Sequence, residues 1–212
     1  MNVTRLRLGP LETNCWIVSD EQAGPAVVVD PADDAPAILE ALNQRQIACI
    51  VLTHRHFDHI GAVRDLMAQT HAPLLVHSLD AEALSTSQGT GGAVFGFDQT
   101  TPRPDRLLED DDLIEAGRVK LTVLHTPGHT PGGICLLAED GSDGPPQLFA
   151  GDTVFAGSVG RTDFEGGDAR ALSRSIASKI APLPEDTVIH PGHGPDTTVG
   201  RERRLNPFFP RA

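Results

Sequence analysis

The sequence predicts an α/β fold, and three observations support this prediction. Short apolar runs of the kind found in buried strands alternate with segments whose apolar residues recur at helical spacing. One run, at residues 47–52, is apolar without interruption, as in a strand that is covered on both faces. Clusters of His, Asp and Gly directly follow several of the runs. Because α/β sheets usually carry their chemistry at the carboxyl ends of strands, these clusters are candidates for a functional site.

Eight short segments are expected to form strands. All are dominated by apolar residues, and their length favours strands over helices. In chain order they are residues 14–18, 26–29, 48–52, 74–76, 119–124, 134–137, 148–150 and 187–189.

Three longer segments are expected to form amphipathic helices. The first spans residues 36–45, with Asp34 as its N-cap. The second begins after the histidine-rich run at residues 54–59, where apolar residues follow at helical spacing. The third spans residues 169–180, with Asp168 as a possible cap. A further short helix is expected near the C-terminus, in the Arg-rich segment that contains Arg201.

Residues 85–105 break this alternation, because they are rich in Gly, Thr and Pro. Two phenylalanines, Phe95 and Phe97, stand between glycines in this stretch. Such a segment is either an active-site lid or a long surface loop.

The size and composition predict one domain that spans residues 1–212. No stretch approaches the ~20 apolar residues of a membrane span, and the N-terminus lacks the apolar core of a signal peptide. Three widely spaced cysteines form no Cys-x-x-Cys pair, so reduced, buried thiols and a cytoplasmic location are expected. The formal net charge of −12 argues against nucleic-acid binding. The sequence leaves the oligomeric state undetermined.

The run from His54 to His59 places four candidate metal ligands within six residues, directly after the strand expected at residues 48–52. If the chain stays extended, His54, His56 and Asp58 point to the same side. His59 breaks the alternation and is therefore available to a second, neighbouring ion. The spacing suggests two metals.

Three further clusters follow strand-like runs, at residues 125–133, 151–153 and 190–195. Each combines His or Asp with Gly or Pro. Glycine allows close approach of the backbone, and proline stiffens the turn. Imidazole and carboxylate ligands together suit zinc, iron or manganese.

These four motifs resemble those of the metallo-β-lactamase superfamily. Its His-x-His-x-Asp-His signature matches residues 54–59, and its later ligands match, in order, His129, Asp152 and His193. The resemblance implies an αββα sandwich of two mixed β-sheets flanked by helices. It also implies that one metal takes His54, His56 and His129, that the other takes Asp58, His59 and His193, and that Asp152 bridges them. Asp30 matches a position behind the metals.

Within the superfamily, the motifs around residues 125–132, 151–155, 160–164 and 201–208 resemble those of glyoxalase II, the hydroxyacylglutathione hydrolases. The last two of these motifs resemble those of the short bacterial members, which lack the C-terminal helical domain. The implied reaction is hydrolysis of thioesters such as S-lactoylglutathione by a hydroxide that bridges two divalent metals, zinc first and iron or manganese as alternatives. Asp58 is the expected catalytic residue, as a ligand that also holds this hydroxide.

Three other branches of the superfamily compete with this interpretation. A mononuclear-iron persulfide dioxygenase shares the ligand run and is the main alternative. A nuclease or phosphodiesterase is disfavoured by the acidic charge. Antibiotic-hydrolysing members commonly carry Cys at the position of Asp152, so that branch is expected to fit poorly.

Two arginines are candidate substrate contacts. Arg161 either binds substrate or pairs with Asp163 or Asp168. Arg201 belongs to an exposed helix face or binds a substrate carboxylate. The remaining histidines are expected outside the ligand set, and they are His71, His77, His125 and His190.

Overall fold

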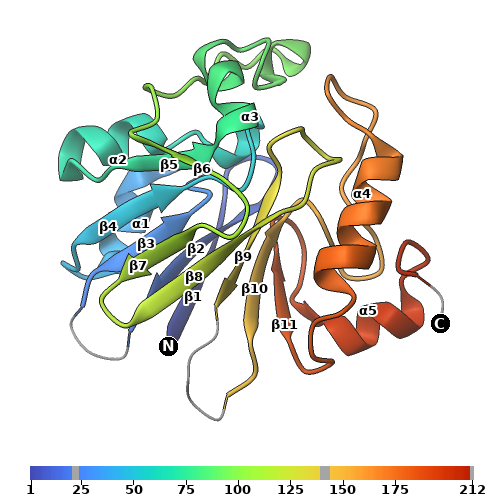
Figure 1. Cartoon of the computed structure of the whole chain (residues 1–212). Coiled ribbons are helices and arrows are strands. Elements are labelled where there is room, and N and C mark those ends of the chain that lie inside the picture. Colours follow the sequence, from blue (N-terminus) through green and yellow to red (C-terminus); the bar gives the residue numbers. More distant parts are fainter. Residues whose placement is uncertain (21–23, 139–143, 211–212) are drawn as a thin grey trace.

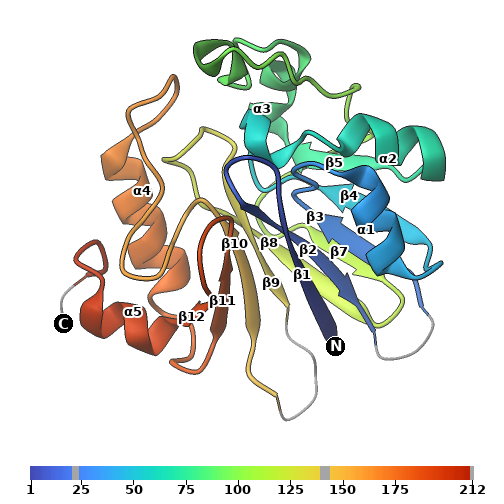
Figure 2. The same ribbon diagram turned by 180° about the vertical axis from the view of Figure 1, so that it is seen from behind.

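The computed structural model describes residues 1–20, 24–138 and 144–210. Two six-stranded sheets lie face to face, and helices cover the outer face of each (Figure 1). Viewed from behind, the same four layers are visible from the opposite side (Figure 2). The expected αββα sandwich of two mixed sheets is confirmed.

The first sheet has the strand order β1-β2-β3-β4-β5-β6. Strands β1, β2 and β3 are antiparallel, whereas β3 to β6 run parallel. The bounds are β1 Asn2–Leu8, β2 Thr13–Ser19, β3 Ala26–Val29, β4 Ile47–Val51, β5 Leu74–His77 and β6 Arg106–Leu108.

The second sheet has the order β12-β11-β10-β9-β8-β7. All of its neighbours are antiparallel except β10 and β11, which run parallel. The bounds are β7 Leu113–Ala116, β8 Val119–His125, β9 Ile134–Ala138, β10 Gln147–Gly151, β11 Val188–Pro191 and β12 Thr197–Thr198.

Helices α1 (Ala35–Leu42) and α2 (Val63–Thr70) cover the first sheet, and α3 (Ser78–Ala81) follows β5. Helices α4 (Ala169–Ser175) and α5 (Val199–Leu205) cover the second sheet. Three 3₁₀ segments occur at Phe57–His59, Glu82–Ser85 and Gly92–Phe95.

The expected caps are confirmed, and two helices differ at their C-terminal ends. The helix expected over residues 36–45 ends at Leu42, because Asn43 takes left-handed backbone angles. Asp34 accepts a hydrogen bond from the Ala37 amide, and Asp168 accepts from two amides of the first turn of α4. The helix expected over residues 169–180 changes after Ser175 into the π-helical segment Ile176–Ile180. Its apolar face still packs on the second sheet.

Apolar side chains fill three layers, and the central layer lies between the sheets. Trp16 and Phe149 meet there edge to face. The outer layers lie between the first sheet and α1 and α2, and between the second sheet and α4 and α5. These layers fix the sheets, and therefore their carboxyl edges, relative to one another.

All eight expected strands are present, and four further strands were not expected. These four, β1, β6, β7 and β12, are the edge strands of the two sheets. An edge strand is partly exposed and often short, so it carries no long apolar run that would mark it in the sequence. In β7, for example, exposed and buried residues alternate strictly.

The extended course considered for the histidine-rich run ends at His56. His56 has extended backbone angles, but the next three residues form a 3₁₀ turn. Asp58 therefore reaches the site from a turn rather than from an extended chain.

Two other expectations concern thiols and membranes. Cys15, Cys49 and Cys135 are buried and free, and burial raises the pKa of the Cys49 and Cys135 thiols to about 11. Among the described residues, no helix is long and apolar enough to cross a membrane.

Candidate metal centre

The candidate ligands meet where the carboxyl ends of four strands converge. The run from His54 to His59 follows β4 of the first sheet. His129, Asp152 and His193 follow β8, β10 and β11 of the second sheet. Both sheets therefore contribute to one centre.

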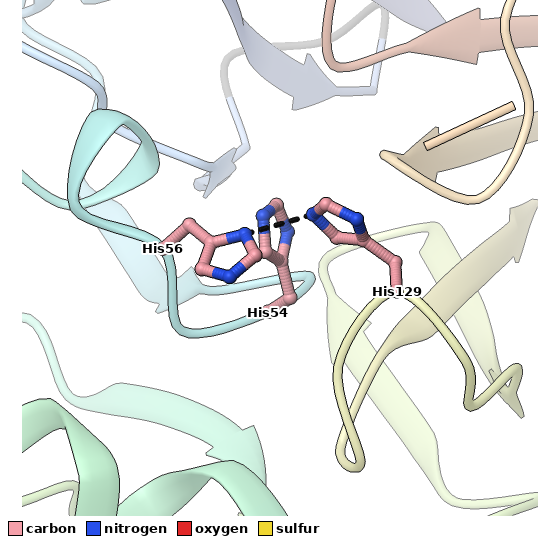
Figure 3. A group of neighbouring side chains, drawn as sticks. All are labelled: His54, His56 and His129. Atoms are coloured by element: carbon pink, nitrogen blue, oxygen red, sulfur yellow. Dashed lines mark hydrogen bonds between the residues drawn. The ribbon is translucent and has the colours of Figure 1, made fainter. Parts of the chain in front are cut away.

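His54, His56 and His129 form the first group, with their ligand atoms within 4.8 Å of one another. Their rings point toward a common point (Figure 3). Nδ1 of His56 lies 2.8 Å from Nε2 of His129. The three ring centroids are 4.5 to 4.8 Å apart.

Asp58, His59 and His193 form the second group, also within 4.8 Å. Oδ2 of Asp58 lies 3.2 Å from Nε2 of His193 and 3.6 Å from Nε2 of His59. Thr13 donates its hydroxyl to the same oxygen at 3.3 Å.

Asp152 lies between the two groups. Its Oδ1 is 3.4 Å from Nε2 of His59. Its Oδ2 is 3.6 Å from Nε2 of His129 and 3.7 Å from Nε2 of His193. Burial opposes ionisation, but the neighbouring imidazoles, His59 first, hold the pKa of this carboxyl below its usual range. A carboxylate in this position is able to serve both groups.

Hydrogen bonds behind the histidines decide which ring nitrogen faces the centre. Nδ1 of His54 lies 3.0 Å from the Thr53 hydroxyl, which itself donates to Asp30 and therefore accepts from the ring. Nδ1 of His129 donates to the Arg161 carbonyl at 2.6 Å. With Nδ1 protonated, Nε2 presents a lone pair to the centre.

The Nε2 atoms of His59 and His193 are turned toward the centre in the same way. Nδ1 of His59 donates to Asp30 at 3.0 Å, and Nδ1 of His193 donates to the Leu11 carbonyl at 3.2 Å. His56 differs, because it presents Nδ1.

Three buried polar atoms of the centre find no hydrogen-bond partner among the residues that the structure describes: Nε2 of His54, Nε2 of His59 and Oδ1 of Asp152. Buried polar atoms are normally paired, and an unpaired one is costly. A cation would satisfy all three. The residues therefore fit divalent metals with imidazole and carboxylate ligands.

Asp30 lies behind the centre, where the resemblance implies it. Its carboxylate accepts from the Thr53 amide at 2.7 Å and from the Thr53 hydroxyl at 2.6 Å, in addition to His59. Its oxygens come close to the ligand atoms of His54 and His59, but three donors already occupy them. Asp30 is thus placed to orient ligands rather than to bind an ion itself.

Glycines allow the surrounding chain to approach the ligands. A Cβ on Gly192 would lie 2.2 Å from Oδ1 of Asp152, and a Cβ on Gly160 would lie 1.9 Å from the Asp152 carbonyl oxygen. Neither position leaves room for a side chain. This explains why glycine accompanies the ligands in the sequence.

The two groups differ in their electrostatics. Burial and the nearby imidazoles lower the pKa of His54, and burial together with His129 lowers that of His56 to about 3. Burial also opposes protonation of His59 and His193, but the carboxylates beside them, Asp58 foremost, raise both pKa values. Protonation is therefore disfavoured at His54 and His56 and favoured at His59 and His193 in the metal-free protein.

Asp80 is a structural residue of the centre that sequence reasoning missed. It is fully buried and accepts from the Arg55 amide, the Thr130 hydroxyl and the Gly132 amide at 2.7 to 3.1 Å. It thereby joins the loop after β4 to the loop after β8. No feature of the surrounding sequence, Ser-Leu-Asp-Ala, marks this role.

The two candidate arginines have partners in the protein. Arg161 makes a two-point ion pair with Asp163 at 2.7 and 2.8 Å and lies over the Phe164 ring. Arg201 donates to Glu202 at 3.0 Å and is half exposed. The side chain of Arg161 therefore pairs with Asp163, which is one of the two alternatives from the sequence. Its backbone carbonyl accepts a hydrogen bond from His129.

Aromatic side chains pack beside the first group. The Phe164 ring lies 5.7 Å from that of His56, and Phe95 lies 6.0 Å from Phe164. Phe95 is half exposed and flanked by Gly91 and Gly96, both with left-handed backbone angles. The segment expected as lid or loop thus places an aromatic ring beside the centre.

Comparison with known proteins identifies relatives along almost the whole chain. The family profile described as the metallo-beta-lactamase superfamily matches residues 8–193. An uncharacterized protein of Aquifex aeolicus is 39% identical, with 98% of this chain and 97% of the relative covered. Hydroxyacylglutathione hydrolase GloC of Haemophilus influenzae is 31% identical, with 99% of this chain and 98% of the relative covered.

Solved structures resemble this fold closely. BLEG-1, a B3 metallo-beta-lactamase, superposes with a TM-score of 0.90 at 37% identity, covering 98% of this chain and 99% of the other. TTHA1623 in a di-iron-bound form has a TM-score of 0.82 at 36% identity, covering 98% and 100%. The first of these does not support the expectation that antibiotic-hydrolysing relatives fit poorly.

Proposed function

The chain belongs to the metallo-beta-lactamase superfamily of metal-dependent hydrolases, and we propose that it hydrolyses acyl thioesters such as S-lactoylglutathione at a dinuclear metal centre. The observation that carries this proposal is the pair of ligand groups with one carboxylate, Asp152, between them. Additional support comes from the hydroxyacylglutathione hydrolase that matches over nearly its full length.

In the proposed centre, one metal is held by His54, His56 and His129, and the other by Asp58, His59 and His193. Asp152 serves both. Zinc is the first choice for these ligands, and the di-iron-bound neighbour supports iron as an alternative. When bound, such ions lower the pKa of a water held between them and polarise a carbonyl group.

The protein groups around the centre have separate roles in the proposed reaction. Oδ2 of Asp58 accepts a hydrogen bond from the Thr13 hydroxyl. This bond keeps the carboxylate oriented while it holds the nucleophile. The aromatic rings of Phe95 and Phe164 shield the acyl group from water. The leaving thiol has a low pKa and therefore needs little protonation.

We further propose that residues 1–212 act as one catalytic domain on small molecules. The three free, buried cysteines support a reducing, cytoplasmic compartment. The net charge of −12 supports a substrate other than nucleic acid.

Two other reactions are alternatives to thioester hydrolysis at this centre. Hydrolysis of a β-lactam amide is favoured by the likeness to BLEG-1. Oxidation of a persulfide at a single iron is the alternative from the sequence.

The decisive experiment measures metal content and activity on the same sample. The proposal expects two divalent metals per chain and turnover of S-lactoylglutathione, monitored by release of the free thiol. A chromogenic cephalosporin tests the β-lactam alternative, and oxygen uptake with glutathione persulfide tests the dioxygenase. One iron per chain, with oxygen uptake and no thiol release, would contradict the hydrolase proposal.

A further inference from the structure

Glu202 is a buried carboxylate that the proposed reaction does not use. It lies in α5 and is fully buried, although glutamate is rarely buried unless it is paired. Four donors surround its two oxygens. Thr197 and Arg201 donate to Oε1 at 2.6 and 3.0 Å, and the Gly157 amide and Asn206 donate to Oε2 at 2.8 and 2.9 Å.

Two of these donors connect α5 to the turn at residues 155–158. Phe155 and Ser158 exchange both backbone hydrogen bonds, so the turn is tight, and Gly157 adopts left-handed angles within it. The Gly157 amide is bound by Glu202, and the Ser158 carbonyl accepts from the Asn206 amide group at 2.9 Å. The turn is therefore held to α5 at two successive residues.

The turn and the three residues that follow it contact both ligand groups of the metal centre. Three residues after Ser158, the Arg161 carbonyl accepts the Nδ1 proton of His129 at 2.6 Å. At the start of the turn, the Phe155 ring packs edge to face on His193, with 6.0 Å between the ring centroids. Gly160, between these contacts, packs against the Asp152 carbonyl and has no room for a side chain.

We infer that Glu202 is a positioning residue of the metal centre. It fixes the turn at residues 155–158, and through this turn the orientation of His129 and His193. The C-terminal helix is then part of the ligand support, in addition to covering the second sheet. This inference rests on the proposed metal centre but not on the proposed substrate.

Arg203 provides a matched control on the same helix. Its guanidinium donates to the carbonyls of Ala181 and Leu183, each at 2.7 Å, and so ties α5 to the end of the preceding helical segment. These contacts stabilise the helix without touching the turn at residues 155–158. Substitution of Arg203 therefore removes a contact of α5 but leaves intact the contacts that connect α5, through the turn at residues 155–158, to His129.

The experiment compares Glu202→Ala, Glu202→Gln and Arg203→Met with the parent protein. Co²⁺ is the probe, because its visible absorption reports the ligand geometry, and its affinity is measured by competition with a chelator. The melting temperature of each metal-free protein is measured separately. Neither readout requires a substrate.

The inference expects Glu202→Ala to weaken Co²⁺ binding by about 10- to 100-fold, the range seen when support behind a ligand is lost. Glu202→Gln, which retains one acceptor oxygen, should be weakened less, and both should change the Co²⁺ spectrum. Arg203→Met should lower the melting temperature but leave the affinity and spectrum unchanged. If Glu202→Ala does not fold, Glu202→Gln alone decides.

A folded Glu202→Gln protein with the parent's Co²⁺ affinity and spectrum would overturn the inference. A parent that binds no Co²⁺ would overturn the metal centre and the inference together. A parent that binds Co²⁺ but releases no thiol would overturn only the proposed substrate.

Discussion

Oδ2 of Asp152 lies 3.6 Å from Nε2 of His129, although the strands that precede these residues, β10 and β8, are separated by β9. Both pairings with β9 are antiparallel, so β8 and β10 run in the same direction. Their carboxyl ends therefore meet at one edge of the sheet. The parallel strand β11 adds His193 at that same edge.

Substitution of Asp152 by alanine should affect both metals, because its two oxygens face both ligand groups. We expect fewer than two metals per chain and an affinity loss above the ~100-fold that removal of supporting residues costs. Metal analysis of the dialysed protein measures this. His71→Ala, an exposed residue at the end of α2, is the control. Retention of two metals by Asp152→Ala would contradict the bridging role.

Replacement of Asp30 by asparagine should weaken metal binding without removing a ligand. Its carboxylate accepts three hydrogen bonds, two from Thr53 and one from His59. An amide nitrogen would face one of these donors and leave it unsatisfied, at a cost of about 1–3 kcal/mol. We expect a lower melting temperature and about 10-fold weaker metal affinity. Unchanged affinity would show that Asp30 supports the fold alone.

A methyl group at position 160 should disrupt the centre. In Gly160→Ala, the new Cβ would lie 1.9 Å from the Asp152 carbonyl oxygen and 2.9 Å from Nδ1 of His129. Backbone would have to shift at a ligand, so we expect both stability and metal content to fall. Gly96→Ala is the matched control, since a Cβ there meets nothing within 4 Å and costs only about 1 kcal/mol of backbone strain. Thermal melting and metal analysis of both variants compare the two effects.

Truncation of Phe95 should weaken substrate binding more than turnover. The side chain is 50% exposed and lies 6.0 Å from Phe164, so substrate would cover it. Loss of about 1 kcal/mol of apolar contact corresponds to a roughly fivefold higher KM for Phe95→Ala. Leu107→Ala, an equally exposed apolar residue in β6, should leave KM unchanged. Equal KM values for Phe95→Ala and the parent would identify residues 85–105 as a surface loop.

His77 should make the metal-free protein less stable in acid. Burial, and then the charge of His125 stacked on it at 4.0 Å, lower its pKa from the usual 6.5, against the opposing effect of Glu109, Asp80 and Asp110. Because the unfolded chain binds this proton more readily than the folded one, stability falls as the pH drops below 6.5.

The substitution His77→Asn tests this pH dependence. Asparagine removes the titrating group but still accepts the Leu79 amide, the bond that caps α3. Melting temperatures of the variant and the parent are measured with chelator as the pH is lowered from above to below 6.5. The melting temperature of the variant should decline less steeply with falling pH. Parallel curves would assign the acid sensitivity to other groups.

The sequence predicted the buried strands and the helices α1, α2, α4 and α5, but neither α3 nor any of the four edge strands. Residues 47–52 are apolar throughout because both faces of β4 are covered, and this pattern identifies a strand without further information. β7 has only four residues, half of them exposed, and β12 has only two. Such segments become strands through pairing with distant neighbours, which a local pattern does not reveal.

The candidate ligands were predictable, whereas most of their supports were not. His and Asp beside glycine at strand ends are visible in the sequence. By contrast, His129 is held by the carbonyl of Arg161 and His193 by that of Leu11. A backbone carbonyl has no sequence signature, so the sequence indicates a role for the side chain of Arg161 but none for its carbonyl. Asp80 and Glu202 likewise depend on contacts across the fold.

The ligands come from residues as far apart in the chain as His54 and His193, and from both sheets. An ion held by such a set acts as a reversible cross-link, and closure of long loops gives the largest gain from a cross-link. Chelation would therefore act on this protein as reduction acts on a disulfide-bonded one. Proteases should cut the chelated protein faster than the loaded one, even at bonds far from the metals.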